Sequence, residues 1–359
     1  MDHPSFTRTL FLHLSKSVPN NAKPKLAKAT YSVSTFPIKS ILHDVMSADA
    51  KFLPKSVIMP DKLHLSEIKG YEWRVDNTYV KLFIFKYKDA ISRTFASSLI
   101  DYISFCVRFL NRLNPRKDVT ISVVPSSVPR LLPLDGVIGA HHVNGGVTTF
   151  GSMQTSNIIV YRLEEMHKVL LHELCHLYRF DYFENGNDYV KGFQEKYKIE
   201  TNWLGLNEAY NESITMLFFI GICIFLQKQP LSWAQFQALY MAEMKATIDF
   251  LIGQAAKIMH YNMSHFGHHK ESTHTFAYYI CKTALLFNTQ AFLEFVDRCG
   301  WRLDNDSKIH RFVALVNACL DKRSFKKSMA NAIQNVPLTR HDLSLRMCRF
   351  DYQLGKQEN

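Results

Sequence analysis

The sequence predicts an α+β fold, and three observations carry this prediction. Segments rich in β-branched and aromatic residues, with one amphipathic helix among them, fill residues 78–162. The next predicted helix contains "VLLHELCHLY" (169–178), in which a single glutamate is the only charged residue apart from the histidines. From about residue 200 onward, apolar residues recur almost entirely at helical spacing. Strands followed by a long run of helices are the order typical of an α+β protein.

The first half of the chain is expected to contain most of the strands. The segment "AISRTFASSLIDYISFCVRFLNRL" has helical spacing and stops at Asn114-Pro115, because the residue before a proline disfavours helix. Glu164 and Glu165 are expected in the first turn of the motif helix, where the helix dipole favours negative charge. The predicted elements are strand 78–88, helix 90–113, and strands 118–124, 144–151 and 156–162.

The second half is expected to be helical. "SWAQ" has the serine-to-glutamine spacing of a capping box. The apolar run "SITMLFFIGICIFL" (213–226) is shorter than the ~18 residues needed to span a bilayer, so we expect a buried core helix and no membrane span. Helices are predicted to begin near Asn207, Ser232, Ser272, Thr289 (ending at Gly300) and Ser307.

These patterns divide the chain into three predicted parts. Residues 1–68 are interrupted by prolines and rich in basic residues, so they are expected to form an irregular N-terminal extension. Residues 69–200 are expected to form an α+β subdomain with the motif helix, and 201–359 a helical subdomain. The N-terminus has no secretory signal pattern, although a transit or pro-segment stays open as an alternative.

The net charge and the cysteines limit which partners and which cellular compartment the sequence predicts. The formal net charge is +11, which favours an acidic partner such as nucleic acid or an acidic substrate, but no nucleic-acid-binding motif is present. The densest basic group is 322–327, for which a solvated face is the simpler interpretation. Seven cysteines without a CxxC pair predict reduced, buried thiols and an intracellular protein. The oligomeric state is not predictable from these features.

The motif "HELCH" predicts a metal site. Positions i and i+4 of a helix lie on one face, so His172 and His176 can bind the same cation. Imidazole nitrogens suit Zn²⁺, and Glu173 lies beside the ion, where it can accept a proton from water. The alternative is a core helix with two hydrogen-bonded histidines, but a buried Glu173 without a partner would be costly.

A zinc hydrolase needs a third protein ligand. The pattern H-E-x-x-H-x-x-G-x-x-H does not fit, because Arg179 stands at its glycine position and Tyr182 at its last histidine. No upstream cysteine motif is present either. "LNEAYNES" (206–213) offers Glu208 as the third ligand and Glu212, one turn later, to orient a ligand histidine. A solvated helix start is the alternative for this pair. Further acidic candidates for the third ligand are Glu200, Glu195, Asp188 and Asp181.

The two motifs together resemble the gluzincin zinc metallopeptidases, the thermolysin-like clan. "HELCH" matches the first motif, and "NEAYNE" matches the second with Glu212 where aspartate is common. The resemblance is specific over about 40 residues and architectural over roughly 75–290. It implies a zincin-like fold, one Zn²⁺, His172, His176 and Glu208 as ligands, and Asn207 and Glu212 supporting them.

The resemblance also implies a substrate-binding edge strand and an oxyanion donor. The segment "NGGVTTF" has the same place in the order of elements as that edge strand, and it extends to Phe150. The candidate substrate-binding residues are therefore Gly145, Gly146, Val147 and Thr148. His274 and Tyr278 lie one turn apart on a predicted helix, and either could donate to an oxyanion. An ordinary histidine and a core tyrosine are the alternative.

The predicted function is a zinc-dependent metallopeptidase with Glu173 as the general base, acting on a peptide or protein substrate, with acidic substrates favoured by the net charge. Endo- and exopeptidase action are not distinguished. Two alternatives stay open. One is an inactive zincin-like protein with a structural or nucleic-acid-associated role, against which an intact Glu173 argues. The other is a zinc hydrolase that acts on a non-peptide bond.

Overall fold

The chain folds into two compact units, each assembled from separate stretches of sequence. The helical unit comprises Met1–Leu12, Arg130–Val143 and Arg179–Phe350, and the sheet unit comprises His13–Pro129, Asn144–Tyr178 and Asp351–Asn359. The computed structural model describes residues 4–18, 27–31, 54–58, 65–87, 93–149, 158–181, 187–202, 204–228, 230–336 and 343–350.

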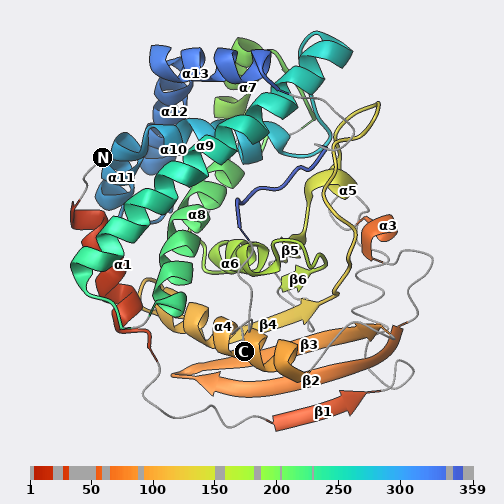
Figure 1. The fold of residues 1–359 in the computed structure, drawn as a ribbon, viewed down its shortest axis with the longest axis vertical. Helices are drawn as coiled ribbons and strands as arrows, with labels where there is room; N and C mark the ends of the chain where they lie inside the picture. The colour runs from red at the N-terminus through yellow and green to blue at the C-terminus, as the bar shows by residue number, and fades with distance from the viewer. Residues whose placement is uncertain are drawn as a thin grey trace. The chain divides into compact units, whose positions relative to one another are not determined.

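The sheet unit is built on a mixed sheet. Its described strands lie in the order β1-β2-β3-β4-β6-β5 (Figure 1). The pairs β3–β4 and β4–β6 are parallel, whereas β1–β2, β2–β3 and β5–β6 are antiparallel. The short strand β5 therefore forms one edge of the sheet. The strands are β1 (Ala27–Tyr31), β2 (Leu65–Val75), β3 (Thr78–Tyr87), β4 (Asp118–Val123), β5 (Gly146–Thr148) and β6 (Ile158–Val160).

Two helices pack beside this sheet. Helix α4 (Arg93–Asn111) connects the parallel strands β3 and β4, and buries Leu99, Ile103 and Leu110 at helical spacing. The indole N–H of Trp73 in β2 donates to Ser104 Oγ of α4 at 2.9 Å. Helix α6 (Met166–Leu177) follows β6 and carries the HELCH motif. A short helix, α3 (Lys55–Ile58), precedes the sheet's long hairpin.

The helical unit has a core of long apolar helices. Helix α8 (Leu206–Gln227) is long and apolar enough to cross a membrane by length and composition, but 89% of its most apolar window is buried inside the protein. Helix α9 (Trp233–Phe266) begins at Ser232 with a capping box and ends at Gly267, whose φ of 72° suits glycine. The other elements are α5 (Ala140–Val143), α7 (Asn187–Tyr197), β7 (Ile199–Glu200), β8 (His269–Lys270), the π-helix η1 (Phe276–Cys281), α10 (Lys282–Phe287), α11 (Thr289–Cys299), α12 (Asp306–Asp321) and α13 (Arg323–Gln334).

Both ends of the described chain pack into the helical unit. At the start of α1 (Pro4–Ser15), the ring of Phe6 stacks on Trp301 with centroids 4.8 Å apart. Residues 343–350, which we call the C-terminal strap, are held by side chains of distant helices. Tyr279 OH donates to Leu345 O at 2.6 Å, and Lys257 Nζ donates to Ser344 O at 3.2 Å.

The structure confirms the mixed αβ class and most predicted elements. The expected strands from 78 to 162 and the helices that begin near Asn207, Ser232, Thr289 and Ser307 are all present. The helix expected near Ser272 starts instead as the π-helix at Phe276. Glu165 precedes α6 in a left-handed conformation and is not part of its first turn. None of the seven cysteines is in a disulfide and all are buried, and burial raises the pKa of Cys319 to about 11.

Two predictions about organisation differ from the structure. Residues 1–68 are not irregular throughout, because α1, β1, α3 and the start of β2 fall within them. The boundaries at 69–200 and 201–359 also differ from the observed units, because the chain passes between the units more than once. A boundary drawn from sequence composition assumes contiguous domains and cannot represent this interleaving.

Candidate metal centre

Two imidazole rings converge on one face of α6. His172 is 6% exposed and His176 is half-buried, whereas every other residue of this helix is buried. Their Nε2 atoms lie 3.0 Å apart, and the rings meet edge to face at 86°. Both rings therefore direct their Nε2 atoms to the same point in space.

This spacing fits a shared metal ion. Two nitrogens bound to tetrahedral Zn²⁺ at about 2.0–2.1 Å lie roughly 3.3 Å from each other. The observed 3.0 Å is close to that value. Without a cation, the same distance is a hydrogen bond from the N–H of one ring to the lone pair of the other. Both histidines can thus be held in a chelating arrangement before a metal arrives.

Glu173 is fixed by the edge strand β5. The hydroxyl of Thr148 lies 2.7 Å from Glu173 Oε2 and 2.9 Å from the Glu173 carbonyl oxygen, and it can donate to either acceptor. A Cβ atom at Gly146 would lie 2.9 Å from both Cγ and Oε1 of Glu173. Only glycine allows the strand to approach the carboxylate this closely. Gly146 and Thr148, predicted to bind substrate, therefore also position Glu173.

The strand β5 is itself held firmly at its start. The buried side chain of Arg162 donates to Asn144 O at 2.7 Å and to Val128 O at 2.5 Å. Gly145 O accepts from Tyr161 N at 2.8 Å, and Val147 pairs with Ile159 of β6. The predicted edge strand is thus present, and its residues 146–148 are half-buried. Phe150, the far end of the predicted substrate stretch, lies outside the described residues.

In the helical unit, Glu208 lies in the first turn of α8. Its backbone N–H donates to Gly205 O at 3.0 Å, and its side chain is half-buried. The neighbouring Asn207 donates from Nδ2 to Asp181 Oδ2 at 3.1 Å. This contact connects the second motif to a residue that the sequence offered as an alternative ligand.

His274 contacts the N-terminus of the same helix. Gly205 N–H donates to His274 Nδ1 at 3.2 Å, so Nδ1 carries the lone pair and the proton of the neutral ring is on Nε2. A Cβ at Gly205 would lie 3.0 Å from this nitrogen, so glycine again permits the close approach. Tyr278 lies one turn later, with its ring edge to face with His274 at 5.8 Å. Both side chains are buried.

Glu212 forms a buried ion pair that the sequence did not predict. Lys282 Nζ donates to Glu212 Oε2 at 2.9 Å, and the two side chains are 0% and 2% exposed. Lys282 also donates to Met347 O of the C-terminal strap at 3.3 Å. The signal for this pair was the lysine inside the apolar run "YYICKTALL", because a buried lysine needs an acceptor.

The alternative third ligands differ from Glu208 in their surroundings. Glu200 accepts from Lys270 at 2.6 Å and from His268 at 2.7 Å, and these hydrogen bonds hold the pKa of its carboxyl below the usual value. Metal binding by Glu200 would require it to leave both hydrogen-bond partners. Asp181 accepts from Asn207, and the side chain of Asp188 lies outside the described residues.

Comparison with known proteins gives no relative. The chain matches no protein-family model, no curated protein and no solved structure. Its own residues and geometry are therefore the basis for assigning a function.

Proposed function

We propose that the protein is a zinc-dependent metallopeptidase of the gluzincin type. His172, His176 and Glu208 would bind one Zn²⁺; two imidazoles and one carboxylate are a donor set that could hold such an ion. The observation that carries the proposal is the 3.0 Å approach of the two imidazole nitrogens on the helix that also presents Glu173. A structural role alone would not require a carboxylate held beside the ligands by Thr148.

Glu173 acts as the general base in this proposal. Bound zinc would polarise the peptide carbonyl and lower the pKa of water. Glu173 takes the proton from the attacking water and delivers it to the leaving amine. The Thr148 hydroxyl and the close backbone of Gly146 restrict the carboxylate to one position, which reduces the reorganisation needed in the transition state.

His274 is suited to stabilise negative charge on the substrate. Because Gly205 N–H donates to Nδ1, the neutral ring offers Nε2–H as a donor. Such a preset donor stabilises an oxyanion as it forms. Tyr278, against the same ring, is the second candidate for this role. Asn207 and Glu212 would act indirectly, by fixing the first turns of α8 that carry Glu208.

The substrate would bind as an added strand. β5 lies at the edge of the sheet, and an extended peptide can pair with such an edge through its backbone. Gly145, Gly146, Val147 and Thr148 would provide that edge. The net charge of +11 would favour acidic peptides.

The first test measures zinc per chain by elemental mass spectrometry on protein purified without added metal. One zinc is expected in the wild type, with a large loss in Glu208→Ala. The matched control is Glu200→Ala, which removes an alternative acidic ligand that is paired with Lys270 and His268. A wild type without zinc, or a loss in the control and not in Glu208→Ala, would reject this ligand set.

The second test measures cleavage of a proteome-derived peptide library by mass spectrometry. Glu173→Gln is expected to keep its zinc and lose cleavage. A wild type with stoichiometric zinc that cleaves no peptide would contradict the peptidase assignment. It would leave the structural role or hydrolysis of a non-peptide bond.

A further inference from the structure

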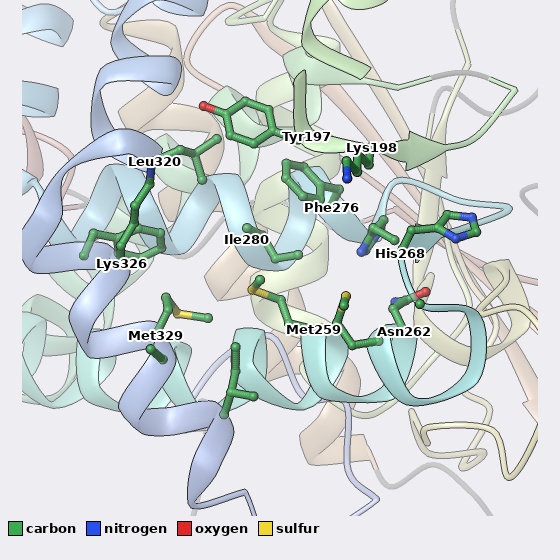
Figure 2. A pocket seen from close by; sticks show the side chains of 16 residues that line it. Tyr197, Lys198, Met259, Asn262, His268, Phe276, Ile280, Leu320, Lys326 and Met329 are labelled. Carbon is green, nitrogen blue, oxygen red and sulfur yellow. The ribbon is translucent and has the colours of Figure 1, made fainter. Parts of the chain in front are cut away.

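A cavity in the helical unit lies apart from the residues considered so far. It measures about 450 Å³ and opens between α9, α13 and η1 (Figure 2). This volume is in the range of small-molecule binding sites. None of the candidate ligands or catalytic residues lines it.

The interior of the cavity is apolar and adaptable. Phe276 and Ile280 of η1, Met259 of α9 and Met329 of α13 all line it (Figure 2). Met263, which also lines the cavity, is 55% exposed. Methionines fill irregular space and repack around different apolar ligands. The cavity is therefore suited to a flexible aliphatic chain.

Apart from the phenol of Tyr197, the ionisable side chains that line the cavity are basic. Its lining includes Lys198, Lys326, His268 and His269, and no aspartate or glutamate. Lys326 and His268 contact acidic residues outside the lining, Asp321 at 2.9 Å and Glu200 at 2.7 Å. Lys198 is exposed and has no ion-pair partner among the described residues. An anionic group at the mouth would meet this lysine without displacing an existing partner.

A buried histidine supplies a second, independent indication of a ligand. The ring of His269 lies edge to face with Phe276 at 5.0 Å, and its Nε2 is 3.0 Å from Glu271 Oε2. His269 Nδ1 is buried and has no hydrogen-bond partner among the described residues. This nitrogen can form a hydrogen bond with an acid head group in the cavity.

We propose that this cavity binds a small amphiphile with an aliphatic tail and a single carboxylate head. The tail lies among Met259, Ile280 and Met329, and the head lies near Lys198 and the imidazole of His269. This site is independent of the proposed peptidase activity, and its residues belong to one unit of the chain.

The test is calorimetric titration of the full-length protein with dodecanoate, below its micelle-forming concentration. We expect saturable binding of one molecule per chain. Dodecyltrimethylammonium, with the same tail and a cationic head, is expected to bind about tenfold more weakly because the rim is positive. Acetate, the head without the tail, should not bind, because burial of the tail supplies most of the affinity. Equal binding of the cationic amphiphile would overturn the carboxylate assignment.

Paired variants locate the site. Ala330→Trp places a large side chain at an exposed lining position of α13 and should abolish binding, whereas Asn331→Trp, exposed on the same helix but outside the lining, should not. Lys198→Gln should weaken binding about fivefold, and Lys191→Gln should leave it unchanged. Circular dichroism checks the folding of each variant. Undiminished dodecanoate binding in folded Ala330→Trp, or in Lys198→Gln, would contradict the proposed site.

Discussion

At Gly146 the backbone of β5 passes close to the motif helix. In Gly146→Ala, the new Cβ would lie 2.9 Å from Glu173 Cγ, Glu173 Oε1 and Val169 Cγ1, so the carboxylate would have to move. A displacement of about 1 Å can lower an enzymatic rate roughly 100-fold. We expect that loss in the rate of library peptide cleavage, with one zinc per chain retained.

A second glycine provides the matched control for this substitution. Gly253 lies inside α9, and a Cβ there would have no atom within 4 Å. Gly253→Ala should leave cleavage unchanged and stabilise the protein by about 0.5–1 kcal/mol, because alanine loses less backbone entropy in a helix. If Gly146→Ala cleaves as fast as the wild type, Glu173 does not depend on this close approach.

Among the elements, α8 and α10 are joined by the ion pair between Glu212 and Lys282. Lys282→Met would keep much of the side-chain volume and leave the Glu212 carboxylate buried without this cation. Loss of one partner of a buried pair costs about 3–5 kcal/mol. We expect a decrease of that size in the free energy of unfolding, measured with urea.

A double variant separates the lost pair from lost packing. In Lys282→Met combined with Glu212→Gln, no charge stays buried at this position, so part of the stability should return. A single Lys282→Met variant that unfolds at the wild-type urea concentration would show that the pair does not stabilise α8.

Sequence patterns predicted the elements that have strong local signals. The capping box at Ser232 and the apolar spacing of 206–227 identified α9 and α8, because these signals depend on neighbouring residues only. In β2, by contrast, the buried residues alternate up to Gly70, but the next residue, Tyr71, is also buried. No simple alternation therefore marks this strand. Helix α13 was missed because its few buried residues, Phe325 and Met329, are surrounded by charge.

Of the candidate site, only the common face of the two histidines could be predicted. The spacing of His172 and His176 sets their common face, and the structure shows their nitrogens together. The contacts around the second motif come instead from residues far away in sequence. Lys282 is 70 residues from Glu212, and the partner of Gly205 is His274. Such pairings depend on the tertiary fold, which a local pattern does not encode.

At the scale of the whole molecule, stability should fall in mild acid because of His167. Burial lowers the pKa of this histidine from 6.5 to about 4, and Tyr102 packs edge to face on its ring. Between pH 6.5 and about 4, the unfolded chain binds a proton at His167 that the folded chain does not. The contribution of neutral His167 to the free energy of unfolding is therefore present above pH 6.5 and decreases as the pH falls. The expected loss from pH 7.5 to pH 5 is about 2 kcal/mol.

Urea unfolding at the two pH values measures this loss. His167→Gln should reduce the difference between them by about the same amount, whereas His260→Gln, at a half-buried position on α9, should keep it. An unchanged pH dependence in His167→Gln would assign the acid sensitivity to other groups.

The packing of α1 has a consequence for how the chain folds during synthesis. Ser5 donates to Asp297 at 2.6 Å across a separation of 292 residues. At translation rates of about 5–20 residues per second, the ribosome needs roughly 15–60 s to produce this partner. Helix α1 is therefore among the last elements to dock, and its apolar face stays available to chaperones throughout that interval. Neither unit is a contiguous fragment, so the helical unit can close only after the sheet unit's strands have been made.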